Sequence, residues 1–274
     1  EFADTGRMIE TTEKLYGPYR WDRYDILVLP PSFPYGGMEN PRLTFLTPTI
    51  VAGDKSLVDV VAHELAHAWT GNLVTNSNAE HFWLNEGFTV FAERRIIEAI
   101  SGKENAMLSA ALGRISLDEA VQRFARRIDL TRLKTELTGI DPDEAFSEVP
   151  YEKGYLFLKA LEAKVGRTAF DAMLKKWLKT HRFQAASTDD FVALVEAELP
   201  GALMAISARE WIYGEGIPEN APQFQSERLL KIDAWTGRIP SEEACRDWRP
   251  VEWQLYLERI PRPAADNVCE LLDE

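Results

Sequence analysis

The chain has 274 residues, of which 45% are hydrophobic, so it is long enough to bury the core of a large domain. Its formal net charge of −13 disfavours nucleic acid and anionic membrane surfaces as partners. No apolar run reaches the roughly 18 residues that a membrane span requires, and no signal peptide is evident, which favours a cytoplasmic location but leaves the compartment open.

The first hundred residues alternate between helical and extended patterns. Asp54 can cap a helix that starts near Leu57, and Gly71 ends that helix. Pro30 stops the first of two short strands, because proline lacks the backbone N–H that a strand interior donates. The predicted elements are a helix, two strands and two further helices, at residues 1–20, 23–29, 43–46, 57–70 and 84–100.

Beyond these elements the apolar spacing is helical. The predicted helices cover residues 103–125, 150–165, 167–181, 188–198, 205–213, 251–257 and 268–272. A stretch rich in glycine and proline separates the last two from the rest and predicts a linker. We therefore divide the chain into a domain at residues 1–214, a linker at 215–224 and a helical segment at 225–274 that is too short to pack well alone.

The pentapeptide His63-Glu64-Leu65-Ala66-His67 carries the strongest chemical signal. Residues four apart on an α-helix lie on one face, so His63 and His67 can direct two imidazole nitrogens at one metal ion. Glu86 follows His67 after eighteen intervening residues, on the next predicted helix, and can fold back as a third ligand. Glu64 lies one step round the helix, beside the metal, where it can take a proton from a zinc-bound water.

The ligand set also indicates which metal is bound and how it acts. Two imidazoles and one carboxylate favour zinc, although cobalt or manganese could substitute. Three protein ligands leave a fourth position for water, which is the pattern of catalytic zinc. The alternative is a pair of hydrogen-bonded core histidines, and it is disfavoured because two of only four histidines fall in this pentapeptide.

A second motif, Gly36-Gly37-Met38-Glu39-Asn40, would by itself be only a turn beside a carboxylate. Together, the segments GGMEN, HELAHAW and WLNEGF resemble the M1 family of zinc aminopeptidases, most closely its leukotriene A4 hydrolase and aminopeptidase B branch. The resemblance extends through LTPT, AGDKSL, IDPD and VPYEKG and covers essentially residues 1–223.

The resemblance implies a fold and an activity. The fold would be α+β and mostly α: a thermolysin-like zinc metallopeptidase catalytic domain, with a small mixed or antiparallel sheet packed on a helical lobe. The segment at residues 225–274 would be the incomplete start of a C-terminal α-helical domain. One Zn²⁺ per chain would serve an aminopeptidase that removes the N-terminal residue from peptides with a free N-terminus.

The resemblance also implies the catalytic roles. His63, His67 and Glu86 would be the zinc ligands. Glu64 would be the general base that activates water and then passes the proton to the leaving amine. Tyr151, in VPYEKG, would donate its hydroxyl to the oxyanion of the tetrahedral intermediate, where such a donor is typically worth roughly 3 kcal/mol of barrier.

Substrate binding would fall to the glycine-rich motif. Glu39 would bind the free α-amino group, so that the scissile bond is the first one. Gly36, Gly37 and Met38 would line the peptide and lend backbone contacts. Glu93 lies seven residues after Glu86 and could orient a ligand histidine, although a salt bridge with a nearby arginine is an equal alternative.

Two departures from the family pattern limit the expected activity. Asp143 falls where the leukotriene branch has an aspartate linked to epoxide hydrolysis, but Phe146 replaces the tyrosine of that branch, so epoxide hydrolysis is only an alternative. Members of the branch also have an N-terminal β domain and a complete C-terminal domain. We therefore expect a fragment against which those domains pack, and which binds zinc but has reduced or no peptidase activity.

Overall fold

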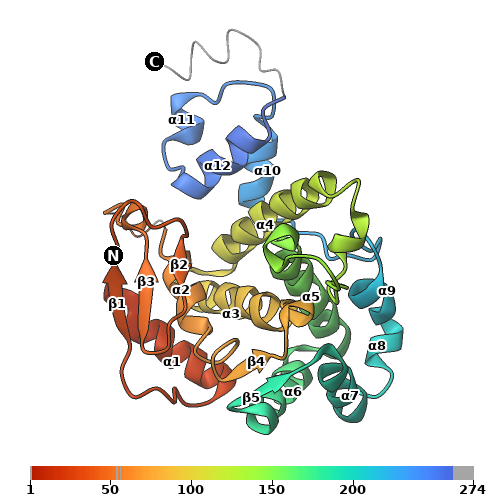
Figure 1. Ribbon diagram of the computed structural model, residues 1–274. Helices are drawn as coiled ribbons and strands as arrows, with labels where there is room; N and C mark the ends of the chain where they lie inside the picture. The colour runs from red at the N-terminus through yellow and green to blue at the C-terminus, as the bar shows by residue number, and fades with distance from the viewer. Residues whose placement is uncertain (1, 54, 56, 262–274) are drawn as a thin grey trace.

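A computed structural model describes residues 2–53, 55 and 57–261 of the chain (Figure 1). The predicted cap at Asp54 and the predicted helix at residues 268–272 lie outside these residues. Among the residues described, no helix is both long enough and apolar enough to span a membrane.

Three short strands form a mixed sheet at one edge of the molecule. They are β1 (Asp25–Val28), β2 (Gly37–Met38) and β3 (Leu43–Leu46), in the order β1-β3-β2. β3 pairs in parallel with β1 and antiparallel with β2. Figure 1 shows α2 (Asp59–Ala66) between this sheet and α3 (Trp83–Ser101), so the helix with the two histidines lies between a sheet and a helical lobe.

Helices make up the rest of the described fold. The longer ones are α1 (Thr5–Tyr16), α4 (Lys103–Arg123), α5 (Gly154–Val165), α6 (Arg167–His181) and α7 (Thr188–Glu198). The shorter ones are α8 (Ala202–Ala205), α9 (Ala208–Tyr213), α10 (Glu227–Asp233), α11 (Glu242–Cys245) and α12 (Pro250–Glu258). Single helical turns lie at Phe2–Asp4, Pro48–Ile50, Ala79–His81, Ile128–Thr131 and Pro142–Ala145, and a π-helix spans Val149–Lys153.

The structure corrects several predicted boundaries. α2 ends at Ala66 and does not reach residue 70, because the next N–H groups bond three residues back, from Ala68 to Leu65 and from Trp69 to Ala66. The helix predicted at 205–213 begins only at Ala208, as α9, because Ala205 ends α8 and Ser207, whose φ is 55°, separates the two helices. The parallel pair β4 (Val74–Asn76) and β5 (Gln184–Ala186) was not predicted, because three residues are too few to show strand periodicity.

α3 runs through the centre of the hydrophobic core. Fourteen of its 19 residues are buried, so the helix contacts protein on every side and lacks a solvent face. It approaches α5 closely where Gly87 meets Gly154, because a Cβ atom on Gly87 would lie only 2.8 Å from the Gly154 Cα. Two glycines therefore bring the residue after Glu86 against the turn that follows Tyr151.

A second, smaller apolar cluster joins the C-terminal helices to α4. Its members are Leu108, Ala111, Leu229, Ile232, Leu255 and Tyr256. Arg228 reinforces this contact because its guanidinium donates to Asn105 of α4 and to Glu252 of α12. The division at residues 214 and 224 stays a prediction.

Lys153 is buried, and no carboxylate pairs with it in the described part of the chain. Its Nζ donates hydrogen bonds to the carbonyl oxygens of Thr131 and Gly214, each at 2.8 Å. Burial, with a smaller contribution from Arg132, lowers the pKa of this amine to about 7. The folded chain therefore holds a lysine that loses its proton near neutral pH.

We expect Lys153 to make the free energy of unfolding rise with pH between about pH 7 and pH 10. In this window the unfolded chain, with a lysine pKa of about 10.4, binds a proton here that the folded chain has released. The gain approaches about 1.4 kcal/mol per pH unit. Lys153→Met should abolish it, and urea unfolding of both proteins across the window measures the difference. Parallel stability curves would show that the folded pKa is not lowered.

Candidate active site

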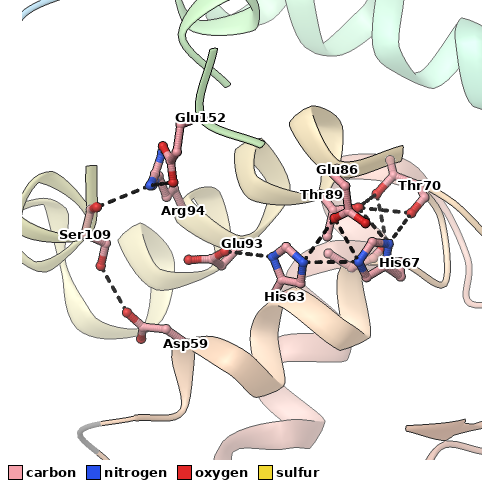
Figure 2. A network of polar contacts seen from close by, with 11 residues as sticks. Asp59, His63, His67, Thr70, Glu86, Thr89, Glu93, Arg94, Ser109 and Glu152 are labelled. Carbon is pink, nitrogen blue, oxygen red and sulfur yellow. Dashed lines mark hydrogen bonds and ion pairs between the residues drawn. The ribbon is translucent and has the colours of Figure 1, made fainter. Parts of the chain in front are cut away.

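Three side chains from α2, its C-terminal turn and α3 converge on one point (Figure 2). The Nε2 atoms of His63 and His67 lie 3.1 Å apart. The Oε2 atom of Glu86 lies 3.4 Å from each of them. The sequence predicted this grouping from the helical spacing and the following helix, and the structure brings the three residues together.

Hydrogen bonds on the far side of each imidazole fix its orientation. The Nδ1 of His63 donates to Glu93 Oε2 at 3.0 Å, since an ionised carboxylate only accepts. The Nδ1 of His67 donates to the backbone carbonyl of Thr70 at 3.0 Å, next to the Thr89 hydroxyl. Both rings therefore carry their proton on Nδ1 and turn an Nε2 lone pair toward Glu86.

The cluster fits a tetrahedral zinc ion. Zinc bonds to imidazole and carboxylate are about 2.0–2.1 Å long, and a tetrahedron of that size separates its ligand atoms by about 3.3 Å. The observed separations of 3.1–3.4 Å match this value. Glu86 Oε2 is also buried without a hydrogen-bond donor, as expected of an atom that needs a cation.

Glu64 lies beside this cluster and is only 7% exposed. Its Oε2 is buried and has no hydrogen-bond partner, and burial raises the pKa of its carboxyl to about 7 although the two imidazoles act in the opposite direction. The backbone of Gly37 lies directly against this carboxylate, where any Cβ atom would collide with it. Because Gly37 lacks a Cβ atom, the backbone can approach Glu64 this closely.

Glu39 follows at the end of β2 and faces the same site. A carboxylate oxygen of Glu39 lies within 4.8 Å of ligand atoms of both Glu64 and His67. Two asparagines hold Glu39 in place: Asn72 donates to its backbone carbonyl at 2.8 Å, and Asn85 donates to its carboxylate at 3.5 Å.

The other members of the motif make fewer contacts with the cluster. Gly36 has only an ordinary contact, since its Cβ position lies 3.9 Å from Val60. Met38 pairs with Phe45 in the sheet and is partly exposed. The motif therefore contributes its closest contacts through Gly37 and Glu39.

Tyr151 reaches the cluster from the π-helix before α5. Its ring stacks on His63 with centroids 6.2 Å apart, and Phe82 and Phe146 pack edge-on against it. Burial, followed by the nearby carboxylates of which Glu86 is the first, raises the pKa of the Tyr151 hydroxyl. The hydroxyl therefore stays protonated and can act as a hydrogen-bond donor.

Comparison with known proteins agrees with this geometry. The model of the peptidase family M1 domain matches residues 1–211. The chain belongs to peptidase family M1. The mostly helical α+β fold predicted from the sequence is thereby confirmed, as is the predicted resemblance to this family.

This M1 chain is similar to a named aminopeptidase and to a solved hydrolase structure. It is 43% identical over 271 residues to "Leucine aminopeptidase 2" of Sclerotinia sclerotiorum, covering 94% of this chain and 44% of the relative. It resembles the structure of yeast LTA4 hydrolase in complex with bestatin with a TM-score of 0.88 and 36% identity, over 96% of this chain and 45% of that one.

A more distant structural relative is an M1 zinc metallopeptidase mutant of Deinococcus radiodurans bound to a Tyr-Ser-Ala substrate. Its TM-score is 0.63 at 28% identity, over 80% of this chain and 46% of that one. This M1 relative is therefore named as a zinc enzyme. The chain spans less than half the length of the relatives to which it was compared.

Asp143 lies away from the cluster in this M1 domain. It lines a separate cavity of about 170 Å³ whose other walls include Phe82, Leu133, Phe146 and Pro150. Its carboxylate makes no hydrogen bond or ion pair with a described residue, whereas its backbone N–H is capped by Asp141. Asp143 is therefore a neighbour of Tyr151 through the cavity wall and not a support of the metal ligands.

Sequence reasoning missed four residues that hold the site together. Thr70 and Thr89 fix His67, and Asn72 and Asn85 fix Glu39. Thr70 acts through its backbone carbonyl, which leaves no trace in residue type. Asn85 could have been found, because a buried amide directly before a ligand on the same helix needs a polar partner.

Proposed function

We propose that the chain is the catalytic portion of a zinc aminopeptidase. The observation that carries this proposal is the triangle of His63, His67 and Glu86, whose ligand atoms have the separations of a tetrahedral zinc site and which has two further carboxylates beside it. These three residues would hold one Zn²⁺. When bound, zinc supplies a Lewis acid that polarises the scissile carbonyl and makes a water acidic enough to attack it at neutral pH.

The neighbouring residues would divide the proton transfers and the charge stabilisation between them. Glu64 would accept a proton from the attacking water and return it to the leaving amine nitrogen. Tyr151 would donate a hydrogen bond from its hydroxyl to the carbonyl oxygen as negative charge develops there. Its packing between His63 and Phe82 holds that hydroxyl near the cluster without a large loss of freedom during the reaction.

Glu39 would make the enzyme an exopeptidase. The Glu39 carboxylate accepts a hydrogen bond from Asn85, and its backbone carbonyl accepts one from Asn72, so the carboxylate is placed to bind the α-ammonium group of a substrate by charge and hydrogen bonding. Because the amine is anchored one residue from the cluster, only the first peptide bond can reach the attacking water. The relatives named leucine aminopeptidase support this class of substrate.

A metal analysis combined with hydrolysis assays tests this proposal. We expect about one zinc per chain, turnover of aminoacyl anilides and little turnover of the same anilides with a blocked amine. Zinc binding without hydrolysis of any anilide would instead make the chain a zinc-binding domain that needs further domains for activity. Absence of bound zinc, with His63→Ala and Glu86→Ala behaving like the parent, would refute the proposal entirely.

Epoxide hydrolysis is the second candidate. It is supported by the apolar cavity beside Tyr151, which Asp143 lines and which is large enough for part of an acyl chain. Phe146 opposes it, because it provides no hydroxyl at the position where the related branch carries tyrosine. Turnover of an unsaturated epoxy acid that exceeds turnover of an aminoacyl anilide would favour this candidate over the first.

Glu93→Gln is expected to weaken zinc binding by about 10- to 100-fold, since the carboxylate that orients His63 and increases its basicity is lost. Competition with a chelating indicator measures the affinity. Glu98→Gln is a matched control, because Glu98 lies further along the same helix and pairs with Arg167 away from the cluster. Equal zinc affinity in the two variants would remove the orienting role of Glu93.

A further inference from the structure

Tyr151 lies in a π-helical turn whose next two residues are both buried and ionisable. Glu152 and Lys153 follow it directly, and both side chains are buried in the protein. Single π-helical turns are rare and depend on the surrounding structure. The position of the Tyr151 hydroxyl therefore depends on what holds these two neighbours.

Glu152 is held by Arg94 of α3. The two guanidinium nitrogens donate to the two carboxylate oxygens at 2.8 and 2.7 Å, which is a bidentate pair (Figure 2). Arg94 is 6% exposed, its guanidinium lies 4.0 Å above the Tyr155 ring, and it also donates to the Ser109 carbonyl at 3.2 Å. A bidentate ion pair with these extra contacts allows little displacement of the Glu152 carboxylate.

The same helix carries the groups that define the other side of the site. Glu86 is one predicted metal ligand on α3, and Glu93, the residue before Arg94, bonds His63. α3 therefore contacts the cluster through one face and the Tyr151 turn through Arg94. Gly113 of α4 packs directly against the Arg94–Glu152 ion pair, since a Cβ atom there would collide with both side chains.

We propose that Arg94 is a positioning residue for Tyr151, which it fixes relative to Glu86 through its ion pair with Glu152. This inference rests on the proposed function, in which Tyr151 donates to the developing oxyanion. Lys153 anchors the same turn by donating to the Thr131 and Gly214 carbonyls. The turn is thus fastened at two consecutive residues, and a shift at either one moves the ring.

The chain provides a matched control one residue further along α3. Arg95 is 8% exposed and is also paired with carboxylates, but its partners are Glu162 of α5 and Asp171 of α6, which do not contact Tyr151. Arg94→Met and Arg95→Met therefore remove the same charge and the same volume from similarly buried sites. Only the first should release the Tyr151 turn.

Kinetics of the zinc-loaded chain test the coupling. Arg94→Met is expected to lower kcat by about 10- to 100-fold with KM little changed, since a shift of about 1 Å in a catalytic group has effects of this size. Arg95→Met should keep kcat. In a Tyr151→Phe background, Arg94→Met should cause no further loss. Equal effects of the two arginine variants, or losses that multiply in the double variant, would overturn the inference.

A second measurement does not depend on activity. With 3-fluorotyrosine incorporated, the ¹⁹F signal absent from Tyr151→Phe reports the environment of that ring. The signal should shift or broaden in Arg94→Met and in Gly113→Ala, which pushes the pair apart without removing a charge, and stay in place in Arg95→Met. If the parent hydrolyses no anilide, the proposed function fails while this signal still decides the positioning. An unchanged signal in both Arg94→Met and Gly113→Ala would overturn the positioning role of Arg94.

Discussion

Replacing Glu64 by glutamine is expected to lower kcat by about 100- to 10,000-fold, which is the usual contribution of a general base. The substitution keeps the size of the side chain and removes its ability to accept a proton. The carboxylate lies beside the metal cluster and not among its three closest ligand atoms, so zinc content should stay at the parent level. Anilide hydrolysis and metal analysis on the same sample measure both quantities.

Glu252→Gln provides the control for this experiment. Glu252 is 5% exposed, close to the 7% of Glu64, but it pairs with Arg228 in the C-terminal helices. Its replacement should leave kcat unchanged, which separates a chemical effect from the general cost of altering a buried carboxylate. Glu64→Gln with bound zinc and turnover within a few-fold of the parent would mean that another group accepts the proton.

The convergence of His63, His67 and Glu86 could be predicted from the sequence because local geometry determines most of their arrangement. Helical spacing alone places His63 and His67 on one face, and this required no knowledge of the rest of the fold. Predicting the position of Glu86 required only that the next helix pack against the helix that carries the two histidines. The predicted grouping forms despite the error at the end of α2, since His67 lies at the last turn, where the backbone is still helical.

The supporting residues could not be predicted because tertiary contacts define them. Arg94 and Arg95 are adjacent and identical in the sequence, yet one pairs with the Tyr151 turn and the other with α5 and α6. The π-helix at Val149–Lys153 reads as ordinary helix, because its apolar spacing over one turn resembles that of α5. The Asn72 and Asn85 contacts with Glu39 join segments that no local pattern links.

Glu39→Ala is expected to reduce kcat/KM by about 100-fold or more for substrates with a free α-amine. Loss of one partner from a buried, hydrogen-bonded charge pair costs about 2–5 kcal/mol, because the ammonium group is then desolvated without compensation. The effect should depend on the substrate amine, since Glu39 lies beside Glu64 without being required to activate water. Zinc content should be unchanged.

Substrates with a blocked amine are the internal control, because they carry no charge for Glu39 to bind. The parent enzyme should favour the free amine over the acetylated form of the same peptide by a large factor, and Glu39→Ala should bring that ratio close to one. Glu39→Gln should fall between them, since its amide oxygen still accepts a hydrogen bond but carries no charge. If the preference for a free amine survives in Glu39→Ala, the amine is bound by a different residue, and the exopeptidase register must be set elsewhere in the enzyme.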